Sequence, residues 1–408
     1  MSLGETILAR ADELAAISER AGMLVRSYLT PQHRAAGERI AGWMRQAGMR
    51  ADFDALGNVA GRYEGREPGA PAVLTGSHMD TVVDAGKYDG IFGILAPIAC
   101  VAELHRRGER LRFPIEIVAF GDEEGVRFGT SMIGSKALAG RFDAATLDSR
   151  DAGGITLRQA LHGFGGDEAK IPSLRRDAKA IRVYVETHIE QGPVLLNEGL
   201  PVGVVTAIAG ATRAKVRLQG EAGHAGTVPM AMRRDALGAA AEMVLALEAR
   251  CRASAGRLVG TVGKLSVGDG GAINVIPGRV DFTVDLRSQD DGARREAVTA
   301  IEAEFRRGAA ARNVDLEWTT LQEMAAAPCD GGEQDRLARA IEAHGIAVRR
   351  LASGAGHDAM QFADRVPTAM LFVRCGNGGI SHSPLETLDA ADAEIATRVL
   401  LRYLEDLR

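Results

Sequence analysis

Short runs of apolar residues alternate with helical stretches along much of the chain. Four of these runs are followed closely by polar residues, at positions 72–76, 115–120, 183–187 and 368–373. Apolar runs of this length, bounded by turns, are typical of parallel strands that are buried on both faces. We therefore expect a largely parallel sheet covered by helices, with functional side chains just after the carboxyl ends of its strands.

The N-terminal part of the chain has mainly helical periodicity. Residues 5–48 are expected to be helical, and residues 54–63 to form strand structure around a turn at Gly57-Asn58. The longest apolar run extends from Ile91 to Val101. It is far shorter than the roughly 20 residues that a membrane helix needs. We expect a buried helix there and no membrane association.

The middle of the chain has a different order of elements. Strands are expected at residues 213–219, 258–267, 279–287 and 314–321, and helices at 234–250 and 293–311. This β-α-β-β-α-β order is typical of a ferredoxin-like domain. The predicted fold class is therefore α/β, with residues 212–326 inserted as one small domain. Residues 1–211 and 327–408 would together form a discontinuous catalytic α/β domain.

Composition excludes several classes of protein. The 408 residues carry a net charge of −5 and form no Lys/Arg-rich block, so a nucleic-acid partner is not expected. The N-terminus has no apolar segment typical of a signal peptide. The four cysteines, Cys100, Cys251, Cys329 and Cys375, lie far apart. This spacing favours a reducing, cytoplasmic location over a disulfide framework.

Two acidic residues and one histidine follow the first apolar run. His78 lies in G-S-H-M-D-T, where Asp80 is placed to hold one ring nitrogen of the histidine. A core histidine beside a turn explains the pair equally well. Asp89, in K-Y-D-G, precedes the apolar helix. Taken alone, it is better explained as a helix N-cap than as a metal ligand.

Three consecutive acids, Asp122, Glu123 and Glu124, follow the second run. Such acids repel one another unless a cation lies among them. His188 follows the third run and His382 the fourth, each weak evidence alone. Taken together, imidazole and carboxylate groups after four strand ends favour a divalent metal site.

The motifs together resemble those of the M20 metallopeptidase and amidohydrolase superfamily. They are GSHMDTV, YDG, GDEEG, THIEQGP, GHAGTVPM, GAINVIPG, DLRS, SGAGHDAM and SHSP, in the family's order between residues 76 and 384. The closest resemblance is to the branch of N-carbamoyl-L-amino-acid hydrolases, allantoate amidohydrolases and β-ureidopropionases. HIEQG distinguishes this branch, because peptidases of the superfamily generally carry a carboxylate at the position of His188.

The resemblance implies a binuclear metal site and the roles of its residues. The implied ligands are His78, Asp89, Glu124, His188 and His382. Asp89 would bridge two divalent ions, with zinc fitting the ligands and manganese, cobalt or nickel as alternatives. Glu123 would be the catalytic base, with Asp80 supporting the site. The resemblance also implies a cis bond after Asp89, and that the inserted domain is a lid that forms a homodimer.

Further residues are expected to bind a substrate that carries a carboxylate. By resemblance, His224 reaches in from the partner subunit to hold the oxyanion, although without the family a turn histidine is the better explanation. Arg287 suits bidentate binding of a carboxylate, with a surface salt bridge as the alternative. Gln191 and Asn274 are expected to donate to substrate oxygens, and Gly356 and His357 to line the same cleft. Ala211 stands where many relatives have Gln, which leaves the choice of substrate open.

The expected activity is metal-dependent hydrolysis of a linear amide or ureido C–N bond. The substrate would be a small carboxylate such as allantoate or an N-carbamoyl amino acid, with release of ammonia and carbon dioxide. The alternative is an aminoacylase or dipeptidase of the wider superfamily, against which His188 argues. A catalytically inactive relative is the third hypothesis, and the presence of Glu123 beside a full ligand set argues against it.

Overall fold

The computed structural model describes residues 1–268 and 271–407. These residues fold into two compact units. Unit 1 comprises Met1–Thr206 and Pro328–Arg408, and unit 2 comprises Ala207–Ala327. None of the helices in the described part of the chain is both long and apolar enough to cross a membrane.

A mixed sheet forms the centre of unit 1. Its strand order is β1-β2-β4-β3-β5-β16-β6-β14, and β15 also pairs with β6. The strands are β1 (Arg50–Phe53), β2 (Val59–Tyr63), β3 (Ala72–His78), β4 (Ile115–Phe120), β5 (Ile181–Ile189), β6 (Val202–Ile208), β14 (Ala327–Pro328), β15 (Arg350–Ser353) and β16 (Thr368–Val373).

The expectation of a largely parallel sheet is wrong for the outer strands. The four central strands β4, β3, β5 and β16 are mutually parallel and correspond to the four apolar runs. Antiparallel strands flank them, since β2 pairs with β1 and β4, and β6 pairs with β16. Parallel strands that are buried on both faces read as continuous apolar runs, whereas β1 is half exposed and has no such run. The pattern of the central strands therefore does not extend to β1, whereas β6 has an apolar run and is almost wholly buried.

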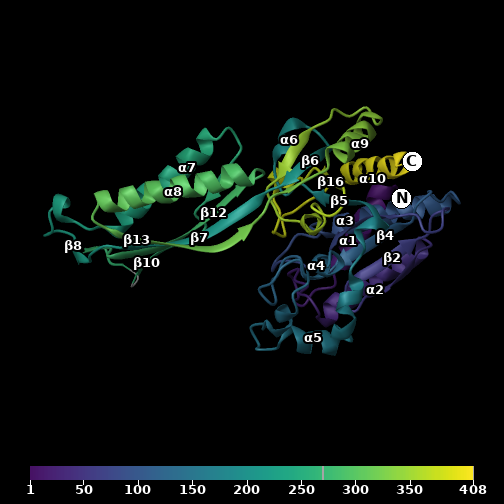
Figure 1. Ribbon diagram of the computed structural model, residues 1–408, viewed down its shortest axis with the longest axis horizontal. Coiled ribbons are helices and arrows are strands. Elements are labelled where there is room, and N and C mark those ends of the chain that lie inside the picture. The colour runs from purple at the N-terminus through teal and green to yellow at the C-terminus, as the bar shows by residue number, and fades with distance from the viewer. Residues whose placement is uncertain (269–270, 408) are drawn as a thin grey trace. The chain divides into compact units, whose positions relative to one another are not determined.

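Helices cover one face of this sheet. They are α1 (Leu3–Ala15), α2 (Pro31–Gln46), α3 (Ile91–Arg106), α9 (Gly331–Glu342) and α10 (Ala390–Asp406). Their apolar residues form one core with strand residues such as Val73, Ile117 and Val185. Helices α1 and α10 pack together and bring the two ends of the chain close to each other (Figure 1). The N-terminal helical segment is interrupted between α1 and α2, because Thr30 and Pro31 start a new helix.

The remaining helical elements of unit 1 are shorter. They are α4 (Ile133–Leu138), α5 (Leu157–Phe164), α6 (Val194–Glu198) and the 3-10 turns at Ala144–Asp148, Glu168–Leu174, Ala178–Ala180, Asp358–Gln361 and Asn377–Gly379. Phe362 stacks on Tyr184 of β5, with ring centroids 4.4 Å apart. The same face of β5 carries Glu186 and His188, because side chains alternate along a strand.

Unit 2 is an antiparallel sheet with two helices. The strand order is β10-β12-β7-β13, with β9 also pairing with β12. Its elements are β7 (Gly210–Gln219), α7 (Ala236–Ala253), β9 (Val259–Thr261), β10 (Leu265–Val267), β12 (Arg279–Ser288), α8 (Asp291–Ala311) and β13 (Asp315–Met324). Helices α7 and α8 lie side by side over one face of this sheet (Figure 1). Unit 2 also contains a small ribbon of β8 (Gly223–His224) and β11 (Val275–Ile276) and a 3-10 turn at Met230–Met232.

Candidate metal centre

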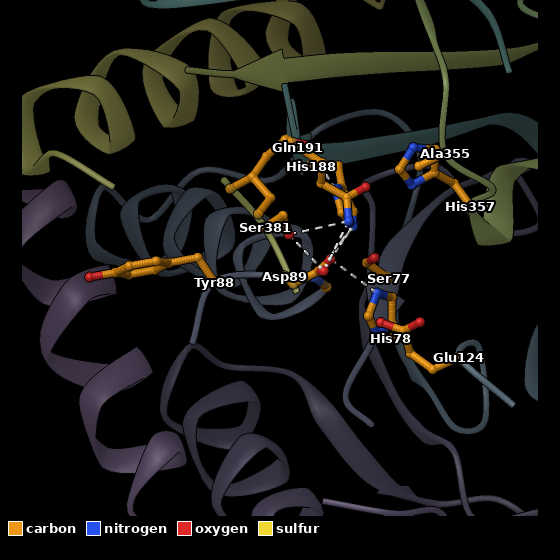
Figure 2. Close-up of polar contacts among 12 residues, drawn as sticks. Ser77, His78, Tyr88, Asp89, Glu124, His188, Gln191, Ala355, His357 and Ser381 are labelled. Carbon is orange, nitrogen blue, oxygen red and sulfur yellow. Dashed lines mark hydrogen bonds and ion pairs between the residues drawn. The ribbon is translucent and has the colours of Figure 1, made fainter. Parts of the chain in front are cut away.

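The Asp89 carboxylate is the centre of a cluster of ligand groups, in which His78 and His188 are buried, Glu124 is half-buried and His382 is exposed. Its Oδ1 atom lies 3.6 Å from Nε2 of His78 and 3.3 Å from Nε2 of His188. Its Oδ2 atom lies 3.2 Å from Nε2 of His382, which is in turn 3.4 Å from Oε1 of Glu124. Figure 2 shows His78, His188 and Ser381 around this carboxylate. The two oxygens of Asp89 thus face two different pairs of ligand groups.

The fold explains why residues distant in sequence meet here. His78 is the last residue of β3, His188 lies near the end of β5, and Glu124 follows β4. These strands are parallel, so their carboxyl ends share one edge of the sheet. The five residues expected to bind metal form two groups of potential ligands that share Asp89. These are His78, Asp89 and His188, and Asp89, Glu124 and His382.

Backbone carbonyl groups orient the two buried imidazoles. Nδ1 of His78 is 3.0 Å from the Asp80 carbonyl oxygen, and Nδ1 of His188 is 2.9 Å from that of Ile189. In a neutral ring, donation from Nδ1 leaves a lone pair on Nε2. Nε2 of both rings lies near Asp89, and Nε2 of His188 also accepts the Gly90 N–H over 3.3 Å. Burial lowers the pKa of His188 to about 4, which keeps this ring neutral.

Asp80 differs from its expected geometry. Its carboxylate was expected to hold the ring of His78, but Oδ1 lies 3.9 Å from Nδ1. The carboxylate instead accepts the backbone N–H groups of Glu123, at 3.1 Å, and Glu124, at 3.2 Å. Asp80 therefore fixes the acidic loop directly, and its carbonyl oxygen holds the imidazole.

The acidic loop concentrates negative charge in a buried place. Burial raises the pKa of Glu123 well above its usual range and that of Glu124 to about 7. Burial and the Asp80 charge raise the pKa of Asp122 as well. Asp122 adopts a φ of 59°, in the left-handed region that Asp enters more readily than most residues. Carboxylates that crowd each other in this way are stabilised by a cation.

The residues present fit a divalent metal. The buried Oδ1 atom of Asp89 has no hydrogen-bond donor within reach, and the Nε2 atoms of His78 and His188 lie 3.6 and 3.3 Å from it. An unsatisfied buried oxygen is costly, and a cation satisfies it. Imidazole nitrogen and carboxylate oxygen are ligands for zinc, manganese and similar ions. The peptide bond after Asp89 is trans, so the expected cis bond is wrong; Gly90 makes the turn with a φ of 67°.

The expected substrate residues of unit 1 lie near the cluster. Nε2 of Gln191 donates to Oδ2 of Asp89 over 2.9 Å (Figure 2), while its Oε1 is buried without a partner. The ring of His357 lies 4.4 Å from that of His188, and its Nε2 is hydrogen-bonded to the Ser353 hydroxyl over 2.7 Å. Burial holds the pKa of His357 well below its usual value. Gly356 precedes it, and a Cβ atom added there would lie 3.1 Å from Cε of Met132.

The remaining expected residues belong to unit 2. Val275 pairs with His224, and the Ala225 N–H donates to the Asn274 carbonyl oxygen over 2.9 Å, so Asn274 lies beside the exposed His224. Arg287 makes two hydrogen bonds to Asp285, at 2.9 and 3.0 Å. This is the salt bridge that the sequence offered as the alternative to substrate binding. It also fixes the orientation of the Arg287 guanidinium. In the sheet, Arg287 pairs with Ala211 of β7.

Sequence patterns missed two buried carboxylates beside the ligands. Glu386 accepts the N–H groups of Tyr88 and Asp89, at 2.8 and 3.2 Å, and the Ser381 hydroxyl at 2.8 Å. The one feature of the sequence that could have pointed to Glu386 is its position four residues after His382. Glu186 accepts from Ser77 over 2.8 Å and from the Ala359 N–H over 2.9 Å. It lies two residues before His188, on the same face of β5.

Comparison with known proteins gives full-length matches. Residues 74–406 match peptidase family M20/M25/M40. The chain is 42% identical to N-carbamoyl-L-amino acid amidohydrolase of Geobacillus stearothermophilus, over 98% of this chain and 97% of that enzyme. It is 40% identical to allantoate deiminase 1 of Glycine max, over 99% and 90% of the two chains. A hydantoinase/carbamoylase family amidase from Burkholderia ambifaria matches with a TM-score of 0.90 and 38% identity, over 98% and 96%.

Proposed function

The chain belongs to peptidase family M20/M25/M40 and to its hydantoinase/carbamoylase branch, and from this membership we propose that it hydrolyses a ureido C–N bond of a small carboxylate. It is an amidohydrolase of the N-carbamoyl amino acid or allantoate type, as its full-length relatives are. The observation that carries the proposal is the pair of ligand groups sharing Asp89, in a chain whose relatives act on ureido compounds.

We propose that this site holds two divalent ions. His78 and His188 would hold one with Oδ1 of Asp89, and Glu124 and His382 the other with Oδ2. Zinc suits these ligands, and manganese, cobalt and nickel are alternatives. Such ions polarise a carbonyl oxygen and make a water molecule more acidic.

Glu123 is the proposed base. It removes a proton from the water that attacks the ureido carbon, and it passes this proton to the departing nitrogen as the C–N bond breaks. The carbamic acid that forms then decomposes to carbon dioxide and ammonia. Asp80 supports this step, because its carboxylate holds the N–H groups of both Glu123 and Glu124. Glu123 is thereby available to take the proton, and Glu124 to bind the metal.

Unit 2 supplies the other proposed roles. We propose that residues 212–326 form a ferredoxin-like lid and dimerisation domain, inserted into a catalytic domain of residues 1–211 and 327–408. Arg287 and Asn274 would bind substrate oxygens, together with Gln191, Gly356 and His357. The N–H of Gly226 donates to Nδ1 of His224, so a neutral His224 carries its proton on Nε2. The Nε2–H group of His224 can therefore donate to the oxyanion, which suits the proposed role.

A homodimer in the cytoplasm is the proposed state of the protein. The four cysteines are all free, as expected in a reducing compartment. Dimerisation is supported by the family resemblance.

The test is ammonia release by the metal-loaded enzyme. The substrates are allantoate, several N-carbamoyl-L-amino acids and N-carbamoyl-β-alanine. N-acetyl-amino acids and dipeptides, scored by release of amine, are the comparison. Ammonia from one ureido compound at a rate well above all the others supports the proposal and names the substrate. Turnover of N-acyl acids or dipeptides alone would assign the chain an aminoacylase or peptidase activity instead.

A further inference from the structure

We infer that Glu386 and Ser381 form a positioning pair that keeps Oδ2 of Asp89 available for a cation. The inference rests on the proposed function in one respect, because it takes Asp89 as the shared metal ligand. Glu386 is 3% exposed and has no part in the proposed chemistry. Its contacts reach the loops of two proposed ligands, Asp89 and His382.

Glu386 joins these loops through its two oxygens. Oε1 accepts the backbone N–H groups of Tyr88 and Asp89, at 2.8 and 3.2 Å. Oε2 lies 2.8 Å from Oγ of Ser381, the residue before His382. The Ser381 Oγ also lies 3.0 Å from Oδ2 of Asp89. Ser381 therefore stands between two carboxylates.

The direction of one hydrogen bond is the key to this arrangement. A serine hydroxyl has a single proton, so Ser381 donates to one carboxylate at a time. The Glu386 oxygen is the nearer acceptor, and the two N–H groups already occupy the other oxygen of Glu386. When Ser381 donates to Glu386, its proton does not occupy a lone pair of Asp89 Oδ2. Gln191 Nε2 already donates to that oxygen over 2.9 Å and takes one of its lone pairs. The oxygen also faces His382 and would bind the ion on the Glu124 side with its other lone pair.

The variant Glu386→Gln reverses the hydrogen bond with little change in shape. The two backbone N–H groups require an acceptor, so they hold the amide oxygen in the Oε1 position. The amide NH₂ group then faces Ser381 and donates to its Oγ. The Ser381 proton turns to Oδ2 of Asp89, where it competes with the cation. Changes to groups that support a metal ligand typically cost about 10- to 100-fold in affinity. We expect a loss of about tenfold or more for the ion on the Glu124 side.

A second substitution separates this mechanism from a purely structural role. In Glu386→Gln/Ser381→Ala the competing hydroxyl is gone, so the double variant should bind this ion more tightly than Glu386→Gln alone. If Glu386 only maintained the fold, the second loss would leave affinity equally low or lower. The two explanations thus predict opposite signs for the change in metal affinity that Ser381→Ala causes in the Glu386→Gln background, and a double-mutant cycle measures this change.

The experiment is a calorimetric titration of the metal-free, full-length protein with Zn²⁺ and with Mn²⁺. Thermal unfolding of each metal-free variant measures the structural cost separately. Glu116→Gln is the matched control, because Glu116 is a buried carboxylate of β4 that binds Arg176 over 2.7 Å. It should bind both ions like the wild type. Wild-type affinity in Glu386→Gln, or a double variant no tighter than Glu386→Gln, would overturn the inference.

Two further outcomes keep the inference separate from the proposed function. A wild-type protein that binds two ions but releases no ammonia would refute the activity, while the titrations still decide the role of Glu386. A wild-type protein that binds no divalent ion would refute both. If Glu386→Gln does not fold, Ser381→Ala alone decides. It should bind metal no more tightly than the wild type, whereas a tenfold gain would mean that Ser381 normally donates to Asp89.

Discussion

The Nε2 atom of His188 lies 3.3 Å from the Oδ1 atom of Asp89, and the two residues come from the end of β5 and from the turn before α3. The Nδ1 atom of this histidine is hydrogen-bonded to the Ile189 carbonyl oxygen, so a neutral ring carries its lone pair on Nε2, where it also accepts the Gly90 N–H over 3.3 Å. These two atoms are placed as two ligands of one cation would be. Substitution of His188 therefore tests the proposed metal site directly.

His188→Ala should weaken metal binding. The loss of groups that only support a ligand costs about 10- to 100-fold in affinity, so loss of the imidazole itself should cost at least about a hundredfold. Metal content after dialysis, measured by mass spectrometry, checks this prediction. His162→Ala is the control, because its side chain is 55% exposed and lies outside the cluster. Equal metal content in both variants would remove His188 from the ligand set.

Glu123→Gln and Glu124→Gln should separate catalysis from metal binding. The first removes the proposed base and should lower kcat by about 10²- to 10⁴-fold while both ions stay bound. The second removes a proposed ligand and should lower metal occupancy. Steady-state ammonia release and metal analysis on the same preparations provide both measurements. If Glu123→Gln also loses metal, Glu123 is a ligand and the base lies elsewhere.

The sequence predicted the central strands and the meeting of the five candidate ligands for one physical reason. Strands buried on both faces need continuous apolar runs, and polar residues that follow parallel strands share an edge. The bounds expected for β4 and β16 are those observed. β1 lacks this pattern because it is half exposed. β6 has an apolar run, VGVVTAI, that is almost wholly buried, but it was not recognised as an antiparallel strand of the sheet.

The supporting groups were beyond the reach of sequence patterns. Glu386 acts on backbone N–H groups, which every residue except proline has, so no pairing of residue types marks it. The same holds for Asp80, whose carboxylate also binds backbone N–H groups. Sequence spacing placed Asp80 near His78 but did not indicate which of its oxygens would reach the ring. Such details depend on the path of the loops in three dimensions.

Gly86→Ala should disturb the site although Gly86 has no side chain there. A Cβ atom at this position would lie 2.2 Å from Cδ of Glu386, whose position is fixed by three hydrogen bonds. Displacement of Glu386 should lower metal affinity about tenfold, in the range typical for supporting groups. Calorimetric titration measures this loss, and an unchanged affinity would contradict it.

Gly42→Ala is the matched glycine control. Gly42 lies within α2, and its added Cβ would meet no atom within 4 Å. Alanine is favoured over glycine in a helix interior by about 0.5–1 kcal/mol. This variant should therefore raise the unfolding midpoint and leave metal affinity unchanged.

His33 should make stability depend on pH. It is fully buried in α2, its Nε2 lies 3.0 Å from the Gly57 carbonyl oxygen, and burial lowers its pKa to about 4. As pH falls from 7 to 5, the unfolded chain binds a proton at this histidine and the folded chain does not. Folding stability therefore decreases, by about 2 kcal/mol from this residue.

His33→Gln isolates this contribution, because glutamine can donate to the same carbonyl but does not titrate. Urea unfolding at pH 7 and pH 5, followed by tryptophan fluorescence, measures the free energy of unfolding for each protein. The wild type should lose about 2 kcal/mol more than the variant over this range. Other titrating groups are common to both proteins and cancel in the difference. Equal losses would show that His33 is already protonated in the folded state, so that its burial does not oppose the charge.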